Sequence, residues 1–168
     1  MDILHVWTDG SCLGNGTSTA VSALGAFYGE HDPRNYSSLL KLDKHTNNRA
    51  ELAAILYVLV MDFESHNLTI HTDSRYSIDC LTKYYARWNQ NGWLTSKGTS
   101  VESATMMKFM LNVIDRRRKI GLSTELVYVK AHDKDPGNNA VDALARKAAS
   151  NKSEGGRLQL LRKCGIPI

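Results

Sequence analysis

The sequence is poor in cysteine and proline, and it contains no long apolar run. Its three cysteines, Cys12, Cys80 and Cys164, are an odd number without CxxC spacing, which argues against a disulfide framework and a zinc cage. No segment approaches the ~20 apolar residues that span a bilayer, and Met1 is followed by a strand-like segment instead of a signal peptide's apolar core. We therefore expect an intracellular protein, cytoplasmic or nuclear, with no membrane attachment.

Length and composition indicate one domain with a single hydrophobic core. The chain has 168 residues, of which 42% are hydrophobic, and this is enough apolar material for one compact domain. Its net charge of +4 permits a polyanionic partner but does not identify one. We expect residues 1–150 to form the domain. Residues 151–168 begin with a Gly- and charge-rich stretch and are expected to form a C-terminal tail with partial order.

Alternating and β-branched segments predict five strands, and segments rich in helix formers predict four helices. The predicted strands cover residues 3–9, 20–28, 36–42, 68–72 and 124–130. The predicted helices cover residues 49–64, 74–88, 101–118 and 139–150. This order predicts an α/β fold, in which an antiparallel meander and parallel strands form a mixed five-stranded sheet with helices on both faces.

Four acidic residues stand at the ends of predicted elements. Asp9 and Asp73 follow strands, and Glu51 and Asp142 lie in the first turn of helices. Each also has a local explanation. A turn pair accounts for Asp9 and a capping box for Glu51. Helix capping accounts for Asp73, and the helix dipole for Asp142, so none of these acids predicts catalysis by itself.

The local explanations leave out one property of the four acids, which is that their carboxylates can bind a metal ion together. Carboxylate oxygens are the hard ligands that Mg²⁺ requires, and two such ions about 4 Å apart can activate a water and stabilise the leaving oxygen of a phosphodiester. Four clustered carboxylates without cations would repel one another. A shared site therefore implies metal, and both Mg²⁺ and Mn²⁺ accept oxygen ligands.

Five motifs occur in the order and with the spacing found in ribonuclease H of type 1, and the chain resembles that family from about Ile3 to Ala149. The motifs are TDGSCLGN (8–15), TNNRAEL (46–52), TDSRY (72–76), NGWLTSKG (91–98) and VKAHDKDPGNNAVDALAR (129–146). The resemblance implies the ribonuclease H-like fold for the catalytic domain. It also implies a monomeric endonuclease that hydrolyses the RNA strand of RNA/DNA hybrids with two metal ions, leaves 5′-phosphate and 3′-hydroxyl ends, and needs no small-molecule cofactor.

The resemblance assigns roles to five residues. Asp9, Glu51, Asp73 and Asp142 fall on the family's metal-binding acids, and His132 falls on its mobile-loop histidine. His132 precedes DKDPGNN, a segment rich in turn formers, so it can move and exchange a proton. Without the resemblance, the sequence indicates only an ordinary exposed loop histidine at this position.

Contacts to the two strands of a hybrid are also implied by the resemblance. The family's contacts to the RNA strand, where amides recognise the 2′-OH, are matched by the turn around Cys12 and by Asn15, Asn47 and Asn48. Lys44 and Thr46 match a pocket that grips a DNA phosphate. Turn, capping and ordinary loop chemistry explains any one of these residues equally well.

The resemblance also implies a groove for DNA sugars at the second predicted helix and the segment after it. That segment resembles the family's basic handle but has fewer basic residues. The residues assigned to this surface are Tyr76, Tyr84, Trp88, Trp93 and Lys97. Core burial is the alternative explanation for the three aromatic residues of the helix. Arg75 stands where glutamine is frequent in the family, and it can add a charge-assisted contact near the scissile strand.

Two other functions compete with this prediction. One is a hybrid-binding module that has lost turnover, although all five catalytic-type residues are present. The other is another nuclease or recombinase of the same superfamily, although such a protein is not expected to keep TNNRAEL and NGW together. Cleavage of matched hybrid, duplex DNA and duplex RNA separates the three.

Overall fold

A mixed five-stranded sheet forms the centre of the computed structural model, which describes residues 2–168. The strands are β1 (Ile3–Leu13), β2 (Val21–Phe27), β3 (Tyr36–Leu39), β4 (Asn67–Thr72) and β5 (Thr124–Tyr128), in the spatial order β3-β2-β1-β4-β5. The first three strands pair antiparallel, whereas β4 pairs parallel with both β1 and β5. The predicted meander with added parallel strands is confirmed.

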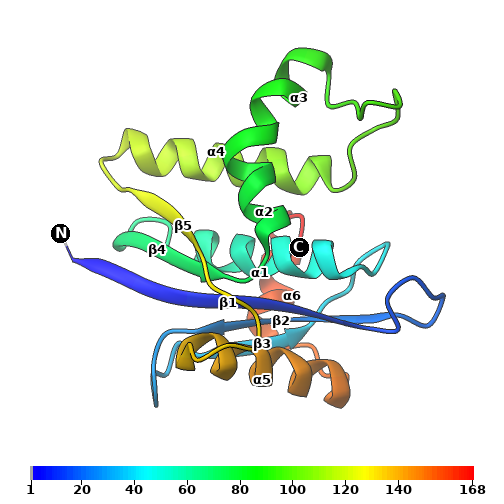
Figure 1. Ribbon diagram of the computed structural model, residues 1–168. Helices are drawn as coiled ribbons and strands as arrows, with labels where there is room; N and C mark the ends of the chain where they lie inside the picture. Colours follow the sequence, from blue (N-terminus) through cyan, green and yellow to red (C-terminus); the bar gives the residue numbers. More distant parts are fainter. Residues whose placement is uncertain (1) are drawn as a thin grey trace.

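Helices cover both faces of this sheet, as predicted (Figure 1). They are α1 (Asn47–Met61), α2 (Arg75–Asp79), α3 (Tyr85–Asn91), α4 (Ala104–Lys119), α5 (Pro136–Asn151) and α6 (Gly156–Lys163), and a π-helix, η1 (Cys80–Tyr84), joins α2 to α3. α5 packs on β1, β2 and β3 from one side, and α1 packs on β1 and β2 from the other, next to α4. Within residues 2–168, no helix combines the length and apolar character needed to cross a membrane.

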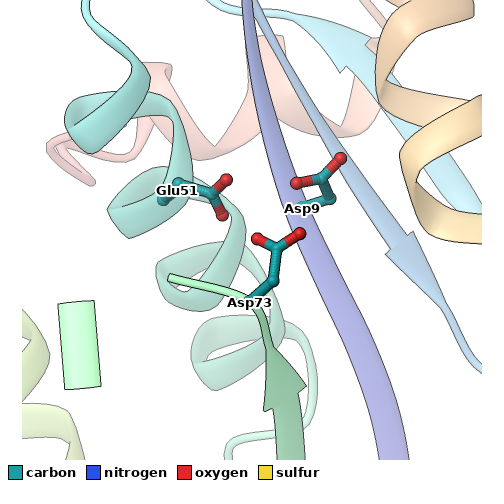
Figure 2. Close-up of side chains that lie close together, drawn as sticks. All are labelled: Asp9, Glu51 and Asp73. Atoms are coloured by element: carbon teal, nitrogen blue, oxygen red, sulfur yellow. The ribbon is translucent and has the colours of Figure 1, made fainter. Parts of the chain in front are cut away.

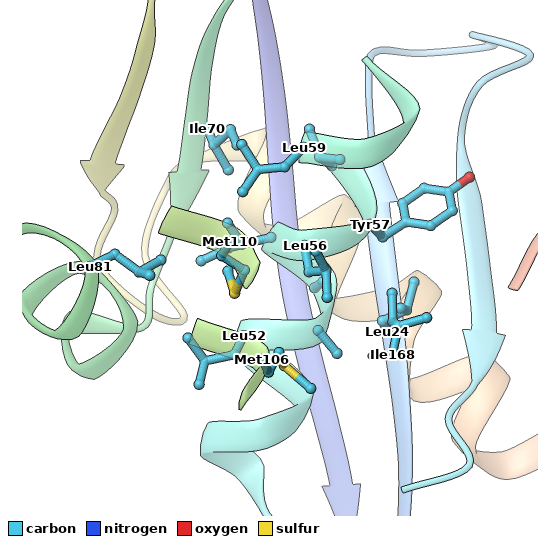
Figure 3. Packing of buried hydrophobic residues seen from close by; sticks show 14 of the residues in the cluster. Leu24, Leu52, Leu56, Tyr57, Leu59, Ile70, Leu81, Met106, Met110 and Ile168 are labelled. Atoms are coloured by element: carbon cyan, nitrogen blue, oxygen red, sulfur yellow. The ribbon is translucent and has the colours of Figure 1, made fainter. Parts of the chain in front are cut away.

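α1 lies at the centre of the hydrophobic core. Its residues are apolar on nearly all sides, so the helix is buried between the sheet and α4 at once. Figure 3 shows Leu56 and Leu59 of α1 among core side chains that include Ile70 of β4 and Met110 of α4. This burial fixes α1, and with it Glu51, relative to β1 and β4.

The C-terminal segment contains a helix that packs on the domain. Residues 156–163 form α6, and Leu158 is fully buried in the core. The N–H of Leu39 donates to the carbonyl of Ser153 (2.9 Å), and the N–H of Gly155 donates to Oγ of Ser38 (2.8 Å). These bonds attach the segment to β3. Apolar side chains that follow its Gly- and charge-rich start, Leu158 above all, provide the anchor.

β1 is longer than predicted. It continues past Asp9 to Leu13, because β2 pairs with it antiparallel from Trp7 onward. Asp9 therefore lies inside a strand and not at its end. Cys12, expected in a turn, also belongs to β1, where it pairs with Ser22.

α1 and α5 begin earlier than predicted, which places Glu51 and Asp142 in the second turn of each helix. Oγ1 of Thr46 accepts a hydrogen bond from the N–H of Arg49 (3.2 Å) and caps α1, and the side chain of Asp135 caps α5 in the same way. The capping-box explanation for Glu51 is therefore wrong, because Thr46 is the N-cap.

Candidate active site

The pairing register of β1 and β4 brings Asp9 and Asp73 together. The two strands run parallel, and their last paired residues are Trp7 and His71. Because side chains alternate along a strand, continuing this register by two residues places Asp9 opposite Asp73 on the same face. β1 continues here by pairing with β2, whereas the chain leaves β4 at Asp73 and turns into α2.

Glu51 joins this pair because α1 crosses β1 closely at Gly10. A Cβ at Gly10 would lie 2.3 Å from backbone atoms of Ala50 and Glu51, so only glycine permits this approach. Figure 2 shows the carboxylates of Glu51, Asp9 and Asp73 directed toward one another from α1, β1 and the end of β4. One oxygen of each carboxylate lies within 4.8 Å of the others.

Asp142 and His132 line the same pocket as these three carboxylates. Asp142 lies close enough to Asp9 for its charge to act on that residue, and Nε of Arg146, one turn later in α5, donates to Oδ1 of Asp142 (3.1 Å). His132 lies in the exposed loop before α5, where its backbone is left-handed (φ 54°). The structure thus brings all five residues assigned to catalysis to one pocket.

Asn138 is a site residue that the sequence analysis missed. Its side chain is 2% exposed, and Nδ2 donates to Oδ2 of Asp73 (3.4 Å). Its Oδ1 has no hydrogen-bond partner within residues 2–168. The available signal was its position between His132 and Asp142 in the last motif, but an asparagine near a helix start is also a common capping residue.

Burial and mutual repulsion raise the pKa values of the clustered carboxyl groups. Burial raises the pKa of Asp9 to about 7, and a hydrogen bond with Glu51 opposes this rise. Burial also raises the pKa of Glu51 well above its ordinary value, and the charge of Asp9 adds to that effect. The pKa of Asp73 is raised by burial, against a hydrogen bond with Asn138 that lowers it. Such a cluster favours bound protons or cations over full ionisation.

The donor set fits a hard divalent cation. Asp9, Glu51 and Asp73 offer oxygen ligands at close range, and Oε2 of Glu51 is buried with no hydrogen-bond partner in the described part of the chain. A buried anionic oxygen without a donor is costly unless a cation binds it. The cluster therefore has the ligand chemistry that Mg²⁺ requires.

The residues expected to contact RNA lie beside the carboxylates. Oδ1 of Asn15 accepts a hydrogen bond from the N–H of Asn47 (3.1 Å), which ties the loop between β1 and β2 to the start of α1. Cys12 and Asn47 line the carboxylate pocket. Asn15, Asn47 and Asn48 are exposed, so their side chains can reach a ligand there.

Lys44 and Thr46, assigned to a phosphate pocket, both interact with other parts of the chain. Nζ of Lys44 lies 3.5 Å from Oε1 of Glu102, the residue before the N-cap of α4. Oγ1 of Thr46 accepts the capping hydrogen bond from Arg49. Because a hydroxyl can donate as well as accept, Thr46 keeps a donor for a ligand.

The aromatic residues divide into exposed and buried members. Tyr84 is 48% exposed and contacts Trp88, with 5.8 Å between ring centroids. Trp88 contacts Trp93 at 5.4 Å, and Trp93, which was assigned to the same surface, is only 6% exposed and so offers little area to a ligand. The left-handed turn at Gly92 (φ 75°) directs Trp93 back toward α3. Tyr76 is half-buried against the core.

Arg75 and Lys97 are both exposed cations. The guanidinium of Arg75, at the start of α2, lies 4.0 Å from the ring centroid of Tyr128 at the end of β5. Lys97 lies in the loop between α3 and α4. Nζ of Lys108 in α4 lies 5.2 Å from the ring centroid of Trp93 and adds a further cation near the aromatic residues.

Solved structures share this fold. The chain is similar to a foamy viral protease-reverse transcriptase in complex with RNA/DNA hybrid, with a TM-score of 0.73 and 20% identity over 88% of this chain and 20% of the other. It is also similar to a type 1 ribonuclease H with the type 2 active-site motif, with a TM-score of 0.65 and 20% identity over 98% and 82%. At these identities the likeness shows the fold.

Sequence comparison shows the family. A ribonuclease H of Schizosaccharomyces pombe is 41% identical over 145 residues, which are 86% of this chain and 52% of the relative, so the chain spans about half of that protein. A ribonuclease H of Novosphingobium aromaticivorans is 34% identical over 149 residues, which are 89% of this chain and 98% of the relative. The RNase H family model matches residues 2–150. This match, together with the fold and the carboxylate pocket, shows that the chain belongs to the ribonuclease H family.

Proposed function

We propose that this chain is an endonuclease that hydrolyses the RNA strand of RNA/DNA hybrids with two Mg²⁺ ions, which Mn²⁺ can replace, and leaves 5′-phosphate and 3′-hydroxyl ends. One observation carries the proposal: Asp9, Glu51 and Asp73 offer oxygens within 4.8 Å of one another, in a pocket that Asp142 and His132 also line. Family membership, and a similar fold in a protein solved with an RNA/DNA hybrid, support it.

The acidic residues of the pocket would hold the metal. Bound there, it would supply Lewis acidity and an activated water for phosphodiester hydrolysis. Asp9, Glu51 and Asp73 provide the buried side of this ligand set, and Asp142 lies on the α5 side of the pocket. Asn138 holds Asp73 from α5, so the orientation of this ligand does not depend on β4 alone.

His132 is suited to proton transfer. It lines the pocket from an exposed loop, where its ring can reach the reacting phosphate and withdraw again. We propose that it exchanges a proton at the leaving oxygen or helps the product to depart. The loop itself is anchored close by, because Nδ2 of Asn139 donates to the carbonyl of Asp133 (3.1 Å).

The surface around the pocket supports recognition of a mixed duplex. We propose that the amides of Asn15, Asn47 and Asn48 recognise consecutive 2′-hydroxyls of the RNA strand. The exposed faces of Tyr84 and Trp88 would pack against sugars of the DNA strand. Both surfaces belong to one chain, and on this basis we propose a monomer. We also propose that it acts without an organic cofactor, in the cytoplasm or the nucleus.

Cleavage of four matched duplexes tests this function: an RNA/DNA hybrid, duplex DNA, duplex RNA, and a duplex with a single ribonucleotide. With Mg²⁺ we expect rapid cutting of the hybrid only, and none in EDTA. One hydroxyl satisfies part of the amide set, and a lost buried polar contact costs about 1 to 3 kcal/mol. Duplex RNA should resist because its second strand carries 2′-hydroxyls against the aromatic surface.

Each other outcome contradicts a specific part of the proposal. Binding of the hybrid without cutting would indicate a hybrid-binding module. Cutting of duplex DNA would indicate another nuclease of the superfamily. Efficient cutting at a single ribonucleotide would refute recognition of consecutive 2′-hydroxyls. End analysis of the products, by ligation and phosphatase treatment, tests the assignment of 5′-phosphate and 3′-hydroxyl ends.

A further inference from the structure

An ion-pair cluster joins the loop before α1 to the start of α4. Its members are Asp43, Lys44, Arg49 and Glu102, and we refer to them as the Glu102 cluster. One oxygen, Oε1 of Glu102, lies 3.5 Å from Nζ of Lys44 and also 3.5 Å from Nε of Arg49. A single carboxylate oxygen therefore faces two cations from a different part of the chain.

Glu102 is a loosely fitted partner for these cations. Charge-assisted hydrogen bonds are usually about 2.7 to 2.9 Å long, and both of its contacts exceed that range. Nε of Arg49 is buried and finds no hydrogen-bond partner within residues 2–168, while its NH1 group donates to Asp43. The cluster thus keeps a buried donor and an exposed ammonium group that a better placed anionic oxygen would satisfy.

The Glu102 cluster lies at the start of α1, the helix that carries Glu51 of the carboxylate pocket. Lys44 is three residues before Asn47, which lines that pocket, and two residues before Thr46, which caps α1. The side chain of Lys44 is 63% exposed and that of Glu102 is 44% exposed, so either can move away from the other. Exposed ion pairs contribute little to stability, and a competing anion can separate them.

We propose that Glu102 determines specificity by occupying, in the free protein, the position of a backbone phosphate of the bound nucleic acid, which must displace it from Lys44. This inference rests on the proposed function, because it concerns how that substrate binds. An isolated phosphate or a short strand gains little by displacing Glu102. A duplex already held at the carboxylate pocket and at Tyr84 and Trp88 supplies the phosphate at high local concentration. Glu102 therefore selects for ligands that reach all of these surfaces together.

Replacement of Glu102 by glutamine tests the competition. Binding of a fluorescent RNA/DNA hybrid is measured by anisotropy in EDTA, so that no hydrolysis occurs. We expect Glu102→Gln to bind about two- to fivefold more tightly, which is the range for removing one exposed ion pair. The slope of log affinity against log salt should steepen by up to about 0.9, as expected for one added phosphate contact. Glu64→Gln, an exposed acid outside the cluster, is the matched control.

A second substitution tests the route of the effect. In a Lys44→Gln background, Glu102→Gln should give no further gain if the competition acts through Lys44. The same gain in both backgrounds, or equal affinity of Glu102→Gln and parent, would overturn the inference. Thermal unfolding establishes that each variant is folded. If Glu102→Gln does not fold, Glu102→Ala replaces it, and this variant should also bind the hybrid more tightly than the parent. Absence of hybrid cleavage by the parent with Mg²⁺ would instead contradict the proposed function.

Discussion

The amide of Asn138 lies 3.4 Å from Oδ2 of Asp73 and joins the first turn of α5 to the end of β4. Asn138 is nearly fully buried, whereas Asp73 is partly exposed at the pocket. This contact links two parts of the chain that are 65 residues apart and supplies an orienting donor to a carboxylate of the proposed metal site.

Asn138→Ala should weaken metal binding while the fold is retained. Partners that orient a metal ligand typically contribute about 10- to 100-fold in metal affinity or activity, so the Mg²⁺ concentration for half-maximal cleavage should rise by about 10-fold. A Mg²⁺ titration of hybrid cleavage measures this, with Asn151→Ala at the exposed end of α5 as control. An unchanged Mg²⁺ midpoint would show that Asp73 is oriented without Asn138.

Asp73→Asn should leave a folded protein with little cleavage. An amide cannot supply the anionic oxygen that binds Mg²⁺, and since an outer partner alone contributes 10- to 100-fold, loss of the ligand should cost more than about 100-fold. Single-turnover cleavage with excess Mg²⁺ measures the loss, and circular dichroism checks the fold. Turnover near that of the parent would rule out this site.

The metal-free protein should become less stable as pH rises through the neutral range. The pKa of Asp9 is about 7 in the folded state, against an ordinary value of 3.8 that we take for the unfolded chain. Between these values the folded state binds the additional proton. The stability that Asp9 contributes is therefore complete below about pH 4 and is lost as pH rises through about 7, by at most about 1.4 kcal/mol per pH unit.

The variant Asp9→Asn tests this effect, because an amide at this position does not titrate. Its free energy of unfolding in EDTA, measured with urea, should exceed that of the parent by a margin that grows between pH 5 and pH 8. Asp2→Asn, which changes an exposed acid on the same chain segment, should follow the parent. Parallel curves for parent and Asp9→Asn would contradict the assigned titration.

Trp88→Ala and Trp93→Ala should separate binding from stability. Loss of the partly exposed Trp88 ring should weaken hybrid binding by about 1 to 3 kcal/mol. Trp93 is 6% exposed, so its removal should instead lower the free energy of unfolding by about 3 to 5 kcal/mol. Anisotropy and urea unfolding of both variants measure the two effects. A Trp88→Ala protein that binds normally but unfolds easily would place Trp88 in the core.

The sequence predicted the sheet and the main helices because their signals are local. The apolar residues of α1 and the alternation in β4 and β5 depend on neighbours within each segment. The carboxylate pocket could also be predicted from the sequence, because Asp9, Glu51 and Asp73 belong to recognisable motifs. The position of Asp9 within its strand could not be predicted, since the length of β1 depends on its pairing with another segment, β2.

Other features depend on contacts that local patterns do not contain. Trp93 belongs to a polar segment with no apolar periodicity, yet a turn at Gly92 buries it. Arg117 occurs in a run of basic residues and is nevertheless fully buried, where NH1 and NH2 donate to backbone carbonyls that include those of Asp62 and His66. Such burial is tolerated only because backbone carbonyls and the hydroxyl of Thr124 accept these donors, and the sequence does not show which acceptors these are.

The attachment of the C-terminal segment to β3 affects how open this outer strand is to pairing with another molecule. An outer strand with open backbone groups can act as a template for pairing with another molecule, which leads to aggregation. The bonds from Leu39 to Ser153 and from Gly155 to Ser38 engage backbone and side-chain groups along β3, and the burial of Leu158 keeps them in place. The family match ends at residue 150, but the residues that cover the outer side of β3 lie beyond it.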